Sequence, residues 1–225
     1  IMMIGGFQRG AIDHMVGVQF GMSQRADLTA TYTEPTSGRS LYSLQSLPGV
    51  MLAEGFRSVP VRLRFGHRGY RTTLEGLDPH GRLMRLLEKD LAPIVLPPEG
   101  VVLSDYLAEL LQVRPGDRLV IDVLEGDRRT VQVAAAAIAE QYLGVGAYMR
   151  RSALNRLLRE GDAISGAHLA VDSPRRGAVY AELKEMPRIA GIIEQTSAIR
   201  AFYDTLAQSV LFFTLIATLL GATIS

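Results

Sequence analysis

Leu44 to Val50 has the sequence LQSLPGV, and Leu183 to Ile189 has the sequence LKEMPRI. Both stretches fit the pattern L-x-x-[LM]-P-x-[VI], in which a proline ends a helix and a β-branched residue begins a strand. A short strand is expected before each helix, at residues 27–34 and 167–172, where Thr, Tyr, Leu and Val alternate with other residues. The pattern therefore predicts two strand–helix–strand units, one near each end of the chain.

Two such units can assemble as one four-stranded sheet backed by two helices, the ferredoxin-like arrangement. We expect residues 27–77 and 166–197 to form this lobe, including a hairpin that turns at residues 66–69 and extends the sheet. Residues 78–165 are then an inserted lobe. Alternating apolar residues at 119–123 and 130–135 predict that it is mostly β, with a helical segment at 82–88. The predicted fold class is α+β.

The two ends of the chain carry apolar helical patterns. Residues 205–225 contain no charged side chain, and this length just meets the roughly 20 residues that a membrane helix needs. The chain begins with Ile1 rather than Met, which indicates a fragment. We expect residues 1–26 to be the end of a first membrane helix and a stalk helix, and residues 198–225 to be a stalk helix running into a second membrane helix.

Steps of three and four residues in both stalk segments predict that the helices pair antiparallel. The pairing residues are Phe7, Ala11, Met15 and Val18 on one helix and Phe202, Leu206 and Val210 on the other. The alternatives are a buried C-terminal helix in place of the membrane helix, and ordinary surface helices in place of the stalk.

The sequence offers no residues for catalysis. The chain has no cysteine, which excludes thiol chemistry and disulfides, and its formal net charge of +1 does not favour nucleic acid. The four histidines lie in different predicted elements, and no metal-ligand spacing, nucleophile elbow or Walker A loop is present. We therefore expect no enzyme activity, no cofactor and no metal. Tyr142, Leu143 and Tyr148 are expected either to form a partner-contact loop or to pack between the lobes.

Several stretches resemble one membrane protein family. Residues 102–117, VLSDYLAELLQVRPGD, are similar to a motif in the extracytoplasmic domain of FtsX/MacB-type ABC transporter permeases. Tyr142-Leu143-Gly144 followed by Ala147-Tyr148-Met149 also resembles this family, as does the ending from Phe202-Tyr203 to Phe212-Phe213. The resemblance covers nearly the whole chain.

The resemblance implies a split ferredoxin-like "porter" lobe with an inserted "sabre" lobe, in the bacterial inner membrane and facing the periplasmic side. It implies a mechanical role, coupling ATP hydrolysis in a cytoplasmic ABC ATPase subunit to work outside the membrane. The implied partners are that ATPase, a second permease copy or homologous subunit, and an extracytoplasmic adaptor or a lipoprotein, lipid or peptide substrate. The alternatives are the ligand-binding domain of a membrane-anchored receptor or sensor, and a membrane-anchored hydrolase.

Overall fold

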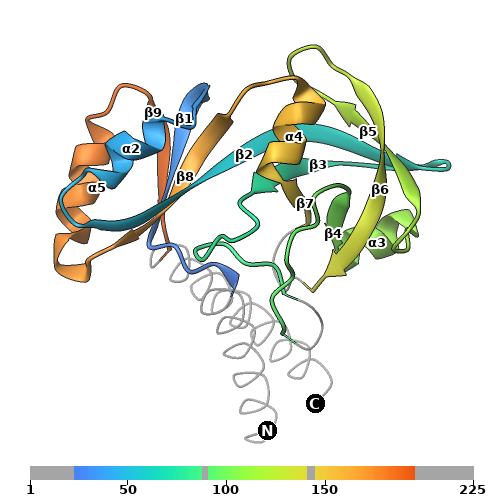
Figure 1. Ribbon diagram of the computed structural model, residues 1–225, viewed down its shortest axis with the longest axis horizontal. Helices are drawn as coiled ribbons and strands as arrows, with labels where there is room; N and C mark the ends of the chain where they lie inside the picture. Colours follow the sequence, from blue (N-terminus) through green and yellow to red (C-terminus); the bar gives the residue numbers. More distant parts are fainter. Residues whose placement is uncertain (1–22, 88–90, 141–144, 196–225) are drawn as a thin grey trace, which may run out of the picture.

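The computed structural model describes residues 23–87, 91–140 and 145–195. Strands dominate an α+β fold (Figure 1). Its elements are β1 (Leu28–Ser37), α2 (Ser40–Gln45), β2 (Val50–Phe65), β3 (Arg68–Leu77), β4 (Val101–Ser104), α3 (Asp105–Leu111), β5 (Arg118–Val123), β6 (Thr130–Ala139), β7 (Gly146–Arg150), α4 (Arg151–Leu158), β8 (Ala163–Val171), the 3₁₀ turn η2 (Ser173–Arg175), α5 (Arg176–Lys184) and β9 (Ile189–Glu194). None of the helices within the described residues is both long and apolar enough to cross a bilayer.

The two predicted strand–helix–strand units lie together in one lobe. Their strands are neighbours in the order β2-β8-β1-β9, and every pair is antiparallel. Helices α2 and α5 cover one face of this four-stranded lobe, where Leu44 and Leu183 pack against strand residues such as Leu28 and Leu169. The prediction that the two units share one sheet is therefore confirmed.

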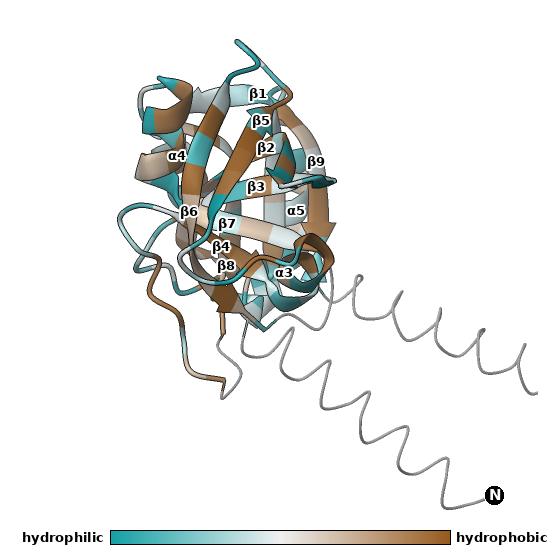
Figure 2. Cartoon of the chain, turned by 90° about the vertical axis from the view of Figure 1, so that its right-hand side faces the viewer, coloured by the Kyte–Doolittle hydropathy of each residue, from teal (hydrophilic) through white to brown (hydrophobic). Residues whose placement is uncertain are grey.

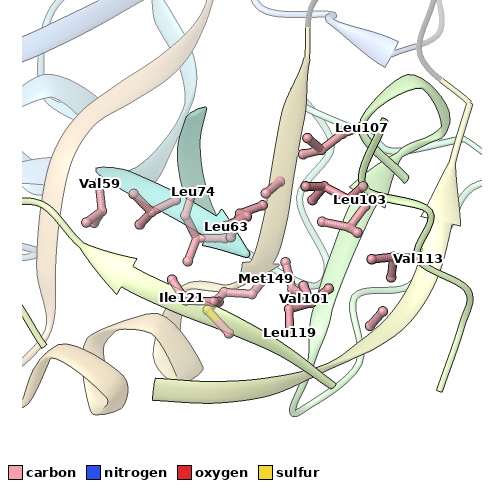
Figure 3. Packing of buried hydrophobic residues seen from close by; sticks show 14 of the residues in the cluster. Val59, Leu63, Leu74, Val101, Leu103, Leu107, Val113, Leu119, Ile121 and Met149 are labelled. Atoms are coloured by element: carbon pink, nitrogen blue, oxygen red, sulfur yellow. The ribbon is translucent and has the colours of Figure 1, made fainter. Parts of the chain in front are cut away.

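A second lobe is a closed barrel of six strands. The pairings run β2-β3-β7-β4-β6-β5, and β5 pairs with β2 again, so the ring closes without a free edge. Side chains from all six strands fill its interior; Leu63, Leu103 and Ile121 are fully buried there (Figure 3). Helices α3 and α4 add Leu107 and Leu154 to this core. Figure 2 shows hydrophobic residues, drawn in brown, on the barrel strands around β5.

The long strand β2 joins the two lobes. Its first half, up to Phe56, pairs with β8, and its second half, from Arg57, pairs with β3 and β5. In Figure 1 this strand runs from the four-stranded lobe into the barrel. The turn after it needs only two residues, with Gly66 at φ +58, a value that glycine adopts without steric cost.

The structure differs from the sequence-based expectation at two places. The β2–β3 hairpin was expected to extend the four-stranded sheet, but β3 pairs in parallel with β7 and belongs to the barrel. Residues 82–87 form no helix; they follow an extended path with isolated bridges from Met84 to Gln24 and from Leu87 to Glu140. Leu86 packs against apolar side chains on the outer surface of the barrel, so this segment is buried there without forming a helix.

Candidate functional site: the junction between the lobes

The junction lies at Phe56, Arg57 and Ser58 of β2, where the strand leaves one sheet and enters the other. Successive side chains of a strand point to opposite faces. Arg57 therefore points to the face that carries the barrel core and the helices, while Phe56 and Ser58 point to the face that lacks helices. The two faces of the junction have different chemistry.

On the first face Arg57 forms a buried ionic clamp. Only 1% of its side chain is exposed, and its guanidinium donates to both carboxylate oxygens of Glu160, from Nε at 2.9 Å and from Nη2 at 2.8 Å. Nη2 also contacts Glu125, and Nη1 donates to the Ser165 hydroxyl at 2.9 Å. Desolvation lowers the pKa of Arg57, but hydrogen bonds to Glu160 and Glu125 outweigh it, so the pKa is raised and the charge is fixed.

The clamp connects segments that are distant in sequence. Glu125 follows β5 of the barrel, Glu160 lies between α4 and β8, and Ser165 is on β8 of the four-stranded lobe. The Ser165 hydroxyl also donates to the Ser58 carbonyl and accepts from the Ser58 amide, both at 3.1 Å. One arginine thus bonds to residues of the barrel, of the four-stranded lobe and of the segment between α4 and β8.

On the opposite face Phe56 stacks on His168 of β8, with 4.6 Å between the ring centroids and 27° between the planes. This contact requires a glycine beside it, because a Cβ on Gly166 would lie 2.6 Å from the Phe56 ring. The His168 Nδ1 is 3.0 Å from the Thr29 hydroxyl, whereas its buried Nε2 has no hydrogen-bond partner in the described part of the chain. Burial lowers the pKa of His168 to about 4, so the imidazole is neutral at pH 7.

A cavity of about 340 Å³ opens on this second face. It is lined by Gln24, Ala26, Thr29, Thr31, Phe56, Ser58, Glu75, Leu83, Met84, His168, Ile193 and Gln195. Glu75, on β3, is partly buried, and desolvation alone raises the pKa of its carboxyl group. The residues at which the chain enters and leaves the domain are in contact here, because the Gln195 side-chain amide donates to the Gln24 carbonyl.

Of the residues that the sequence singled out, only Tyr148 lies within the described part of the chain. It stands on β7 with 3% of its surface exposed, and it packs in one cluster with Phe56, Leu86 and Leu96. Tyr148 is therefore buried within the molecule, and the partner-contact expectation for the loop that includes Tyr142 and Leu143 stays a prediction. The other candidate loop residues, Tyr142 and Leu143, fall outside the described residues.

The seven residues expected to pair the stalk helices also fall outside the described residues. They are Phe7, Ala11, Met15, Val18, Phe202, Leu206 and Val210. Within residues 23–87, 91–140 and 145–195, no three His, Asp or Glu side chains gather closely enough to hold a metal ion.

Sequence reasoning missed the residues of the junction. Arg57 occupies an inward position in the β2 alternation between Gly55 and Val59, and a charged residue at such a position is a signal of a buried ion pair. His168 and Glu75 occupy outward positions on strands that were treated as ordinary sheet. Only the closure of the barrel beside the open sheet brings these two outward faces to one cavity.

Comparison with known proteins gives a match in structure but none in sequence. No protein-family profile and no curated protein sequence matches this chain. The periplasmic region of MacB from Actinobacillus actinomycetemcomitans superposes with a TM-score of 0.51 at 11% sequence identity, covering 78% of this chain and 92% of that one. The extracellular domain of the ABC-type transporter YknZ from Gram-positive bacteria gives a TM-score of 0.49 at 11% identity, covering 68% and 87%. The chain therefore has the fold of the periplasmic region of MacB.

Proposed function

We propose that this chain is the extracytoplasmic domain of an ABC transporter permease subunit in a bacterial inner membrane. It passes movement from the membrane to a substrate or adaptor outside. The observation that carries the proposal is the shared fold with the periplasmic region of MacB, which extends over 92% of that chain. In this interpretation the four-stranded lobe is the split ferredoxin-like porter lobe and the barrel is the sabre lobe.

The positions of the domain ends support this role. The Gln195 side chain contacts Gln24, and the Gln195 backbone N–H donates to the Asp27 carbonyl at 3.0 Å. The chain thus enters and leaves the domain at one place, as a domain inserted between two neighbouring membrane helices requires. Movement of those helices would reach the domain through a single attachment.

The junction supports a mechanical role because it is built to be rigid. A buried guanidinium held by two carboxylates and a hydroxyl cannot move without breaking several charge-assisted hydrogen bonds. Strand β2 passes through both lobes without interruption. The two lobes therefore move together as one lever, and this lever would amplify a small displacement at the chain ends.

In this role ATP is hydrolysed by a separate cytoplasmic ABC ATPase subunit, and a second permease copy or a homologous subunit completes the transporter. The receptor or sensor alternative predicts that the full-length protein continues into a cytoplasmic signalling domain. Co-purification of the full-length protein distinguishes the two, since only the permease retains an ABC ATPase.

The absence of cysteine from the chain allows a direct topology test. Tyr42 is 74% exposed on α2, so Tyr42→Cys presents one accessible thiol in this domain, and the unaltered full-length protein is the control for cysteines elsewhere. In intact cells carrying the full-length protein, a maleimide that does not cross the inner membrane should label this thiol. Labelling only after the inner membrane is opened would place the domain in the cytoplasm and end the proposal.

The coupling role is tested at Leu206, one of the predicted stalk residues. In the full transporter, Leu206→Asp should leave ATP hydrolysis running while transport is lost, because a charge in an apolar helix pairing separates the helices. Leu206→Met, which keeps the apolar character, is the matched control and should transport normally. Normal transport with Asp at this position would contradict the lever.

A further inference from the structure

We propose that the cavity on the helix-free face of the junction binds a small amphipathic amine, a ligand with an apolar body and one protonated nitrogen. This site is independent of the mechanical role. It is built from strands β1, β2, β3, β8 and β9 of the two lobes together with Leu83 and Met84 of the segment that follows β3. Figure 1 shows these elements meeting where the two lobes join.

The apolar part of the cavity defines the body of the ligand. The Phe56 ring and the side chains of Leu83, Met84 and Ile193 supply its apolar lining. Ile193 is 60% exposed although it borders this cavity, so an apolar surface is left open to an occupant. A volume of about 340 Å³ is at the small end of the range for ligand pockets, which favours a compact ligand.

Glu75 defines the charge of the ligand. No described residue forms an ion pair with this carboxylate, and desolvation is the only cause of its raised pKa. A partly buried carboxylate without a counterion is destabilised, and a cation placed beside it removes that cost. A ligand ammonium group would be the missing counterion, whereas a ligand carboxylate would be repelled.

His168 supplies a second polar contact. Its Nδ1 lies within hydrogen-bond distance of the Thr29 hydroxyl, and its Nε2 is buried and lacks a partner within the described residues. The His168 ring itself belongs to the cavity lining. The low pKa of His168 keeps the ring neutral at pH 7, so it does not repel a cation. When the Thr29 hydroxyl accepts from Nδ1–H, Nε2 is left as an acceptor, which an N–H or O–H group of the ligand reaches once the side chains that cover this atom move.

The test uses three probes of equal chain length and different charge: hexylamine, hexanol and hexanoate. Each is titrated into the purified 225-residue chain at pH 7 and followed by calorimetry and by the ring nitrogen resonances of His168. Hexylamine should bind with a dissociation constant below roughly 1 mM, which is within the limit for a ligand of this size. Hexanol should bind at least about tenfold more weakly, and hexanoate should not bind.

Two variants separate a specific site from general hydrophobic adsorption. Glu75→Gln keeps the size of the side chain and removes its charge, so hexylamine affinity should fall about tenfold or more while hexanol affinity is unchanged. Glu182→Gln, at an exposed position of α5, is the control and should bind hexylamine as the unaltered chain does. Equal affinity for hexylamine and hexanol, or unchanged hexylamine affinity in Glu75→Gln, overturns the proposal. Neither result affects the topology or coupling tests of the proposed function.

Discussion

The two lobes bury their apolar residues in different ways. The barrel closes on itself and encloses a cluster of eighteen buried residues, to which all six strands and two helices contribute. The four-stranded lobe has nine, all on the face covered by α2 and α5. Its other face carries Thr29, Thr31 and His168, and opens to the cavity.

Because of this difference, the barrel is the lobe suited to rigidity and the four-stranded lobe is the one suited to binding. A closed barrel has no free edge and no uncovered face, so it is suited to transmit force. An open sheet covered on one side leaves its second face available for a ligand or a partner. The hydrogen bonds of Arg57 connect the barrel to the four-stranded lobe beside this open face.

The largest expected effect comes from a matched pair of core substitutions. Leu103 in the barrel and Leu169 in the four-stranded lobe are both fully buried. Leu→Ala substitutions of this kind cost about 2–5 kcal/mol, and the cost rises when the surroundings cannot collapse into the cavity. We expect Leu103→Ala near the top of this range and Leu169→Ala near the bottom, because helices can shift on an open sheet. Denaturant unfolding measures both. A larger loss for Leu169→Ala would mean that the barrel is not the more rigid lobe.

The second prediction breaks the connection between the lobes. Arg57→Met leaves Glu125 and Glu160 close together without their counterion, and removing one partner of a buried ion pair costs about 3 kcal/mol or more. Two spin labels, at Tyr42→Cys and Gln132→Cys, report the distance between the lobes, and their distance distribution should broaden in Arg57→Met. Arg64→Met is the control: Arg64 pairs with Asp122 at 2.6 Å on the surface of the barrel, and its loss should leave that distribution narrow.

Local sequence signals predict the individual helices and strands. They do not predict that six of the strands close into a barrel. The two L-x-x-[LM]-P-x-[VI] stretches locate both helix–strand junctions, because a proline that ends a helix acts only on its immediate neighbours. The parallel pairing of β3 with β7 joins residues more than seventy positions apart, and no local pattern encodes such a register. The sequence therefore predicts both strands of the hairpin but not the sheet to which the hairpin belongs.

The candidate site shows the same limit. No local pattern distinguishes Arg57, Glu75 or His168 from other strand residues. Arg57 is set apart by its distant ion-pair partners, and Glu75 and His168 by burial that shifts their pKa values. The leucines of residues 82–87 have helical spacing, yet they pack in an extended segment on the barrel wall. Tertiary packing outweighs local propensity where a ready apolar surface is present.

The smallest expected effect is a pH dependence confined to the open lobe. Burial lowers the pKa of His168 from 6.5 to about 4, so the unfolded chain takes up this proton first as the pH falls. The stability that neutral His168 contributes is complete above pH 6.5 and is lost as the pH falls toward 4. Between pH 7.5 and pH 5 the loss is about 2 kcal/mol from this group.

Glu75 acts in the opposite direction, because its raised pKa makes the folded state less stable as the pH rises above the ordinary value for a glutamate. The effect of His168 is therefore measured as the difference between the unaltered chain and His168→Phe, which keeps an aromatic ring against Phe56. His67→Gln, in the exposed β2–β3 turn, controls for the loss of a histidine elsewhere. Hydrogen exchange at pH 7.5 and pH 5 should show that amides of β8 lose protection in the unaltered chain while those of β4 and β5 keep it. An equal loss in both lobes would mean that they unfold as one unit, and that the division between a rigid barrel and an open binding lobe does not extend to their stability.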